Sequence, residues 1–161
     1  MNNSSNKLDK YDRKLLQELQ SDGRISNLEL AEKANLSAAP CWRRVRKLEK
    51  EGFIDRYTAL LNPEKIGLFA MGYIQISLIN HHHETLEKFN DFVMNAAEVL
   101  ECYSVSGNYD FLIRVVASDT LAFEDFLMKK LLPTNVVQST NTDFVLRQKK
   151  YTTQLMVSEQ E

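Results

Sequence analysis

The first 50 residues carry their apolar side chains at helical spacing, in three short stretches that turn residues separate. Leu15, Leu16 and Leu19 would share one face of a first amphipathic helix. A capping box over residues 26–29, Ser-Asn-Leu-Glu, predicts the start of a second helix, which extends to about residue 34. Three short helices with a tight turn between the second and the third are typical of a helix-turn-helix.

The third predicted helix, over residues 37–50, has two different sides. Cys41, Val45 and Leu48 fall at helical spacing and form its predicted buried side. The remainder is basic, because residues 37–50 hold five Lys or Arg and one Glu, a local charge of +4. A basic helix face of this kind can supply the phosphate contacts that nucleic-acid binding needs.

A strand is predicted over Phe53–Leu61, directly after this helix, and Asn62-Pro63 ends it. The acidic part of the chain begins at the same point. We therefore predict a disordered arm over residues 1–7, a helix-turn-helix domain over 8–62, a linker over 63–69 and a second domain over 70–161.

The second predicted domain alternates strand-like and helix-like periodicity. Its predicted elements are a strand at Ala70–Asn80, a helix at Glu84–Asn95, strands at Val99–Ser106 and Phe111–Ala117, a helix at Leu121–Leu132, and a last strand at Val136–Tyr151. The order β-α-β-β-α-β is that of the ferredoxin-like fold. The predicted fold class is α+β: an N-terminal, winged-helix-like helix-turn-helix domain followed by a ferredoxin-like βαββαβ domain.

The distribution of charge favours DNA as a partner of the first domain. The whole chain has a net charge of −2, which by itself argues against a nucleic-acid binder. Residues 1–62, however, hold twelve basic and nine acidic side chains (+3), and residues 63–161 hold eight and thirteen (−5). Net charge is a poor guide where two halves of a chain differ in sign.

The sequence also bears on the compartment. The N-terminal residues are polar and lack the apolar core of a signal peptide. No apolar stretch approaches the ~18 residues of a membrane span. Cys41 and Cys102, the two cysteines, have no metal-type spacing and are interpreted as reduced thiols. These features predict a cytoplasmic, nucleoid-associated protein with no membrane partner.

Each exposed side chain of the third helix suits a particular contact with double-stranded DNA. Residues near the start of a recognition helix reach base edges in the major groove, where Arg can bind guanine through two hydrogen bonds. Polar and basic residues beside them contact phosphates. The predicted DNA-binding residues are Ser37, Ala38, Ala39, Trp42, Arg43, Arg46, Lys47 and Lys50, of which Ser37, Lys47 and Lys50 are assigned to phosphates.

The alternative is a solvated basic face on an ordinary amphipathic helix. Trp42 favours DNA binding, because a large aromatic side chain on a charged face needs a partner. Arg44 flanks the apolar side and is open to two interpretations: it binds DNA, or it holds the second helix or the following loop.

Several motifs resemble those of the leucine-responsive regulator/AsnC family, also called feast/famine regulators. They are Leu8-Asp-x-x-Asp12, Asp22-Gly-Arg-Ile-Ser26, Glu29-Leu-Ala31, Leu36-Ser37, Pro40-Cys41-Trp42-x-Arg44-Val45-x-x-Leu48-Glu49, Gly52-Phe-Ile54 and Tyr57-Thr-Ala-Leu-Leu-Asn-Pro63. The resemblance extends from about residue 8 to 150. It implies a transcription regulator that binds pseudo-palindromic DNA and responds to a free amino acid or related metabolite, with no other cofactor. It also implies a homodimer that builds octamers, with the segment around residues 57–62 pairing between subunits.

The second domain contains a segment similar to the ligand loop of this family, Val105-Ser-Gly-Asn-Tyr-Asp110. Gly107 can turn successive N–H groups toward the carboxylate of an amino acid, and Asp110 can accept from its ammonium group. The effector-binding residues that the resemblance implies are Ser106, Gly107, Asn108, Tyr109, Asp110, Thr140 and Thr142. Asn108 stands where the family often has Asp. Taken without the resemblance, the same loop is good hairpin-turn chemistry.

No catalytic or metal-binding residues are predicted. His81-His-His83 is interpreted as a solvated loop, because adjacent residues cannot all face one ion and no Asp or Cys cluster accompanies them. The chain has no P-loop, Rossmann glycine pattern or nucleophile elbow, so we predict that it is not an enzyme. Two rival hypotheses remain: an enzyme or metabolite carrier built on the ferredoxin-like half, and an architectural DNA binder with no effector.

Overall fold

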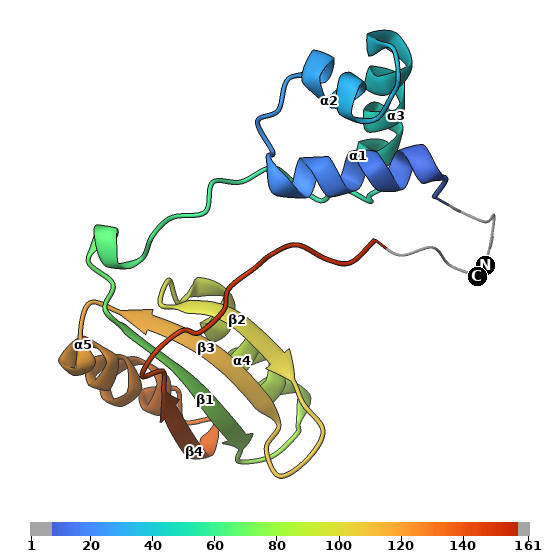
Figure 1. Cartoon of the computed structure of the whole chain (residues 1–161). Coiled ribbons are helices and arrows are strands. Elements are labelled where there is room, and N and C mark those ends of the chain that lie inside the picture. The colour runs from blue at the N-terminus through green and yellow to red at the C-terminus, as the bar shows by residue number, and fades with distance from the viewer. Residues whose placement is uncertain (1–7, 158–161) are drawn as a thin grey trace. The chain divides into compact units, whose positions relative to one another are not determined.

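Three helices, α1 (Lys10–Ser21), α2 (Asn27–Lys33) and α3 (Ala38–Lys50), form the DNA-binding half that the sequence predicts (Figure 1). The structure is a computed structural model and describes residues 8–157. The arm predicted for residues 1–7 lies outside the described residues. The chain divides into two compact units: Met1–Leu60 together with Lys150–Glu161, and Leu61–Lys149. The sequence analysis had assigned residues up to 161 to the second domain.

Capping and turn residues fix the ends of these helices. Asp9 caps α1 and Ser26 caps α2, each in a reciprocal capping box with the residue three positions on. Asn35 takes the left-handed conformation (φ 53°) that the tight turn between α2 and α3 requires. The three helices enclose a core that contains Leu15, Leu16, Leu30, Ala31, Ala34, Cys41 and Leu48.

The single chain forms no strand over Phe53–Leu61, so this prediction is wrong for the structure described. The structure assigns no strand to these residues, and within the described chain the backbone of residues 55–61 makes no hydrogen bond with other backbone groups. A strand is held by the N–H and C=O groups of a neighbouring strand, and none lies beside this segment. A short 3-10 turn, η1 (Glu64–Ile66), follows in the predicted linker.

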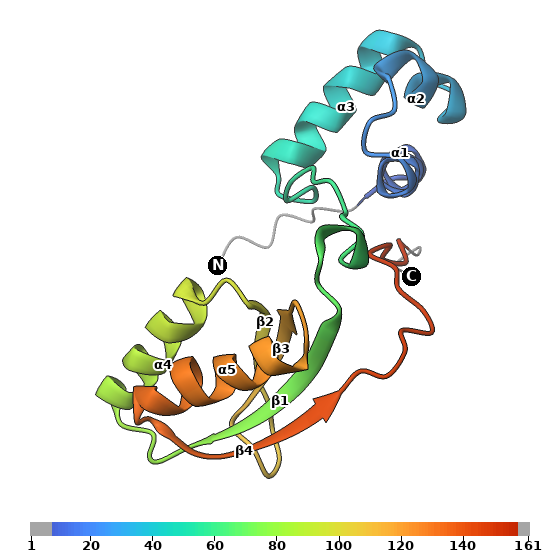
Figure 2. The same ribbon diagram turned by 90° about the vertical axis from the view of Figure 1, so that its left-hand side faces the viewer.

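The second unit contains a four-stranded antiparallel sheet with helices on one face, which is the ferredoxin-like arrangement that was predicted (Figure 2). Its elements are β1 (Ala70–Leu78), α4 (His83–Asn95), β2 (Val99–Ser104), β3 (Phe111–Ala117), α5 (Thr120–Asp125), a π turn η2 (Phe126–Leu131), a 3-10 turn η3 (Leu132–Thr134) and β4 (Val137–Phe144). The strand order is β2-β3-β1-β4, so the first and third strands of the sequence lie in the centre.

Alternation along β1 determines which face of the sheet is covered. Every second residue from Ala70 to Leu78 is buried, and the residues between them are partly exposed. The buried side chains pack with Phe89 of α4 and with Phe123 and Phe126 of the segment α5–η2. Gly72 passes close to the ring of Phe123, where an added Cβ would lie 2.8 Å from Cζ. Within residues 61–149, no helix covers the other face of the sheet (Figure 2).

Most predicted elements in this unit lie within two residues of the observed bounds, and two depart further. The helix predicted over Leu121–Leu132 is an α-helix only as far as Asp125 and then continues as a π turn. The last strand ends at Phe144 instead of Tyr151. Pairing with β1 ends near residue 72, with one further bond from the Val145 amide to the Met71 carbonyl (2.9 Å), so later residues have no strand to pair with.

Candidate DNA-binding and effector sites

Helix α3 presents to solvent all the side chains that were assigned to DNA. Ser37, Ala38, Ala39, Trp42, Arg43, Arg46, Lys47 and Lys50 are all exposed. Cys41 and Leu48 are buried and Val45 is partly buried, as predicted for the opposite side. Ser37 is the N-cap residue of α3 but makes no side-chain capping hydrogen bond. Its hydroxyl is therefore not used by the helix itself.

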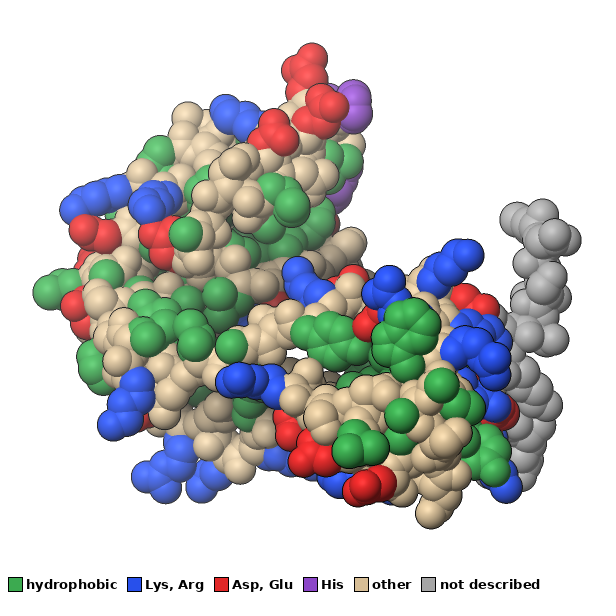
Figure 3. All heavy atoms as spheres, turned by 90° about the horizontal axis from the view of Figure 1, so that it is seen from above, with side chains coloured by type: hydrophobic (Ala, Val, Ile, Leu, Met, Phe, Trp, Pro, Cys, Tyr) green, Lys and Arg blue, Asp and Glu red, His purple; other side chains and the backbone are tan. Residues whose placement is uncertain are grey.

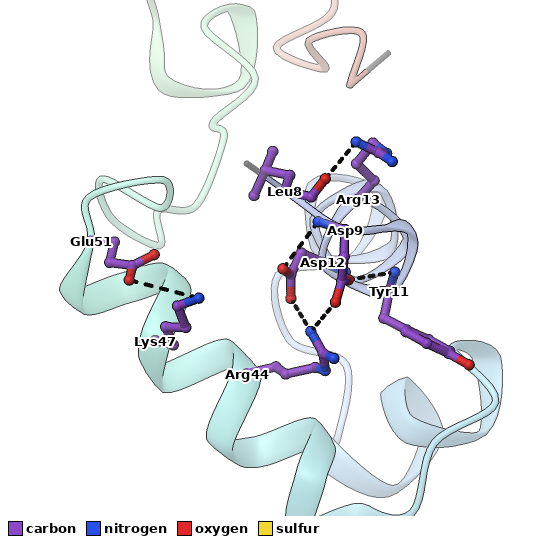
Figure 4. A network of polar contacts seen from close by, with 8 residues as sticks. All are labelled: Leu8, Asp9, Tyr11, Asp12, Arg13, Arg44, Lys47 and Glu51. Atoms are coloured by element: carbon purple, nitrogen blue, oxygen red, sulfur yellow. Dashed lines mark hydrogen bonds and ion pairs between the residues drawn. The ribbon is translucent and has the colours of Figure 1, made fainter. Parts of the chain in front are cut away.

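Arg44 is the exception on this helix, because it holds α3 against the start of α1 (Figure 4). Its Nη1 lies 2.7 Å from both Asp9 Oδ2 and Asp12 Oδ1. Its guanidinium also lies over the ring of Tyr11, 5.4 Å from the centroid. Of the two interpretations, the structure supports a structural role, but the partner is the first helix, not the second helix or the following loop.

The Arg44 contact joins a cation to two carboxylates that already cap α1. Asp9 accepts hydrogen bonds from the amides of Tyr11 and Asp12 (both 2.8 Å), while Asp12 accepts from the Asp9 amide. Burial would raise the pKa of Asp9, but the bonds from the Asp12 amide, Arg44 and the Tyr11 amide outweigh it and lower that pKa. The hydrogen bonds that Arg44 donates to Asp12 and Asp9 raise the pKa of Arg44. Asp12 is only 6% exposed.

Trp42 lies beside a shallow cavity of about 300 Å³ in the first unit, which the sequence analysis did not predict. Tyr57, from the segment after α3, lines the same cavity and donates from Oη to Glu49 Oε1 (3.2 Å). Arg46 pairs with Glu49 Oε2 (3.3 Å), and its guanidinium lies 5.7 Å from the centroid of the Trp42 ring. The pair is exposed, so a DNA phosphate or base could compete for Arg46 at little cost.

The predicted ligand loop connects β2 to β3 and has a row of free amides. Val105 donates to the Asp110 carbonyl (3.0 Å), and the Asp110 amide donates to the Ile76 carbonyl (2.9 Å). Between these two bonds, the four amides of residues 106–109 donate to no protein group in the described chain. Gly107 has a φ of 137°, which glycine adopts readily and other residues rarely do.

The Asp110 carboxylate is bound on both oxygens. The Leu78 amide donates to Oδ2 and His81 Nε2 pairs with Oδ1, both at 2.8 Å. These two contacts lower the pKa of Asp110. His81 was interpreted as part of a solvated loop, and its contact with a residue 29 positions away has no signal in the sequence. A carboxylate can accept about four hydrogen bonds, so Asp110 retains capacity for a ligand ammonium.

Thr140 and Thr142 lie on β4 at the same end of the sheet as this loop. Thr140 is the register partner of Ile76 and Thr142 that of Ile74. Directly opposite residues of an antiparallel pair point to the same face, so both hydroxyls lie on the helix-covered side. Because the Asp110 amide is bonded to Ile76, the loop and Thr140 flank the same residue of β1.

Other kinds of site find no support in the described residues. Among residues 8–157, no group of three or more His, Cys, Asp or Glu is placed to hold a metal ion. Over the same residues, no helix combines the length and the apolar character needed to cross a membrane. Large hydrophobic side chains do lie exposed on both units, interspersed with charged ones (Figure 3).

These two units define a class of protein. Residues 8–55 match the winged helix-turn-helix DNA-binding family, and residues 71–155 match the Lrp/AsnC ligand-binding domain. The protein is therefore a transcription regulator with a DNA-binding domain and a ligand-binding domain, and not an enzyme. The chain belongs to the Lrp/AsnC family, which confirms the resemblance seen in its motifs.

Relatives match nearly the whole chain. The leucine-responsive regulatory protein of Escherichia coli (strain K12) is 40% identical over 150 residues, which are 93% of this chain and 92% of that protein. A transcriptional regulator of Neisseria meningitidis, solved in complex with L-methionine, is 39% identical with a TM-score of 0.90 over 92% of this chain and 96% of that one. An AsnC family regulator of Agrobacterium tumefaciens is 38% identical, with a TM-score of 0.88 over 92% and 97%.

Replacing Arg44 with Ala is expected to destabilise the first unit by about 2 kcal/mol, because it leaves the buried Asp12 carboxylate without its cation. Hydrogen exchange of α1 and α3 in urea measures this. The matched change Arg43→Ala, at an exposed residue of the same helix, should cost less than about 0.5 kcal/mol.

The lowered pKa of Asp9 gives the sign of the pH dependence of this stability. The share that Asp9 contributes is present above the ordinary pKa of 3.8 and is lost as pH falls through the lowered pKa. Equal stability of the two variants at pH 7 would rule out the structural role of Arg44.

Proposed function

We propose that the chain binds DNA by placing α3 in the major groove, with Ala38, Ala39, Trp42 and Arg43 at the base edges. The observation that carries this proposal is that neighbouring arginines of α3 differ in their contacts. Arg44 is committed to α1, while Arg43 is exposed and forms no ion pair with any residue in the part of the chain that the structure describes. Arg43 is thus available to bind guanine through two hydrogen bonds.

The other basic residues of α3 serve affinity more than selectivity in this proposal. Ser37, Lys47 and Lys50 contact phosphates, and Arg46 reaches either a base or a phosphate after leaving Glu49. Because phosphate contacts release counterions, binding should weaken steeply as salt is raised. A regulator of chromosomal genes acts where the chromosome lies, so we place this protein in the cytoplasm, on the nucleoid.

The double change Arg43→Ala and Arg46→Ala is expected to lower affinity for a DNA site selected from a random pool by roughly 100-fold or more. Each two-bond contact with guanine contributes about 1–3 kcal/mol of discrimination. Fluorescence anisotropy with labelled DNA measures the loss. The double change Lys65→Ala and Lys88→Ala removes the same charge at two other exposed residues and should leave selectivity intact. Wild-type selectivity in the α3 variant would show that another surface reads the bases.

For the ligand-binding domain, we propose a free amino acid bound at the β2–β3 loop, with L-methionine as the first compound to test. The four free amides of residues 106–109 can bind a carboxylate, as in other concave groups of backbone amides. Asp110 can accept from the ammonium, and Thr140 and Thr142 add hydroxyl groups at the same end of the sheet. L-methionine is chosen because the Neisseria meningitidis relative was solved with it.

Asn108 and Tyr109 complete the proposed effector site. Tyr109 is partly buried and can form one wall beside the ligand, while Asn108 and Ser106 are exposed on the loop. The side-chain amide of Asn108 is neutral, so the loop has one negative charge fewer than it would have with Asp at this position. A less negative loop repels the carboxylate of an amino acid less.

L-methionine at 100 times its Kd should stabilise the wild-type chain by about 2.7 kcal/mol, measured as a rise in melting temperature. Thr140→Val and Thr142→Val keep the side-chain volume but remove the hydroxyl groups, so each should reduce this rise. Ser139→Ala, which removes a hydroxyl from the opposite face of β4, should not. If none of the common amino acids shifts the melting temperature, the proposed effector class is wrong.

We also propose that the protein acts as a homodimer that assembles further to octamers. The segment 55–61 supports this, because its backbone has no protein partner within residues 8–157 and its Leu60 and Leu61 are 59% and 68% exposed. Pairing with the same segment of a second copy would satisfy both the backbone groups and the apolar side chains. Two DNA-binding units related by a two-fold axis then suit a pseudo-palindromic site.

Leu60→Asp should weaken the dimer, because the change places two like charges close together across the two-fold axis. Sedimentation velocity should show a shift toward smaller species at micromolar concentration. Met94→Asp, at an 83% exposed position of α4, is the control for adding the same charge elsewhere. A Leu60→Asp protein that sediments as the wild type would place the subunit contact outside this segment.

A further inference from the structure

The C-terminal segment returns to the DNA-binding unit and binds the end of α1. Gln20 forms two hydrogen bonds with the backbone of Leu155: its Oε1 accepts from the Leu155 amide (2.6 Å), and its Nε2 donates to the Leu155 carbonyl (3.1 Å). Gln154 adds a bond from Nε2 to Ser21 Oγ (3.3 Å). A side-chain amide that holds both backbone groups of one residue imitates the pairing of a neighbouring strand.

Apolar packing accompanies these hydrogen bonds. Val157 is partly buried and packs against the core of the first unit, the cluster that contains Leu15 and Leu16. The backbone of residues 150–157 belongs to no helix and to no sheet. The segment therefore binds the first unit through both polar and apolar contacts.

The C-terminal contact with α1 brings the chain back to the unit in which it began. The first unit consists of residues up to Leu60 and residues from Lys150 onward, while the second unit is everything between them. The chain therefore passes from one unit to the other twice, once after Leu60 and once after Lys149. The first passage is permanent, whereas the second exists only while the C-terminal segment stays bound to α1.

We propose that residues 151–157 are an intramolecular ligand of the DNA-binding unit: a strap that docks on the C-terminal turn of α1 through Gln20. Docked, it ties both ends of the ligand-binding domain to the DNA-binding unit, so that rearrangement of the sheet edge at β4 is transmitted through the strap. Released, it leaves the two units joined by residues 61–69 alone.

The contacts between the strap and α1 are weak enough to break and re-form. All the hydrogen bonds of the strap are exposed to solvent, and Leu155 and Met156 are 77% and 97% exposed. Exposed hydrogen bonds of this kind are individually weak. They suffice here because the segment is covalently attached, which raises its effective concentration at α1.

Gln20→Ala tests the strap, with Gln17→Ala as the matched control. Both changes place Ala in α1, where it favours helix, but Gln17 is exposed and its side chain makes no hydrogen bond with residues 150–157. Hydrogen exchange of the full chain, read on peptides covering residues 151–157, should be slowed in the wild type and in Gln17→Ala. Losing two hydrogen bonds should speed it by roughly tenfold in Gln20→Ala. Unprotected exchange in the wild type, or equal rates in the two variants, would overturn the docking.

A second measurement tests the transmission, which rests on the proposed function. The ratio of DNA affinities with and without L-methionine is measured for the wild type, Gln17→Ala, Gln20→Ala and a chain ending at Lys150. The strap predicts a ratio nearer to one in the last two. If all four chains share the wild-type ratio, the strap docks but transmits nothing. If the wild type itself has a ratio of one, the proposed effector response fails, while the exchange rates still decide the docking.

Discussion

One guanidinium group, that of Arg44, links helix α3 to the start of α1. Arg44 connects α3 to Asp9 and Asp12. The carboxylates of these two residues also form the capping box at the N-terminus of α1. The contact therefore joins a helix cap and an inter-helix ion pair into a single network, in which each carboxylate has two functions. The network adds a polar link between α1 and α3 to the apolar core that the three helices share. The exposed residues of α3 can then vary without loss of this link.

The elements of the fold are predictable where the signal is local. Ser26 and Asp9 specify helix starts through residues three positions away, and Asn35 specifies the turn through its own conformation. The alternation along β1 predicts a strand with one covered face. The exposed side of α3 likewise follows from spacing alone, since Cys41 and Leu48 fix which side is buried.

The remaining features could not be predicted because their partners are distant in sequence, or because the described residues offer no neighbouring strand. The partner of Arg44 is 32–35 positions away, and that of Asp110 is 29 positions away. The return of residues 150–157 to α1 spans 135 positions. The strand expected over Phe53–Leu61 has a suitable sequence but no neighbouring backbone, so propensity alone did not decide it.

Trp42 gives the molecule a built-in optical probe. It is the single tryptophan of the chain, it lies 58% exposed on α3, and the Arg46 guanidinium lies over its ring. Indole emission depends on solvent exposure and on nearby charges, so fluorescence excited at wavelengths that tyrosine does not absorb comes from one position on the exposed side of α3. Its colour and intensity should therefore follow the occupancy of that surface, while events in the sheet of the other unit remain spectrally silent unless they reach α3.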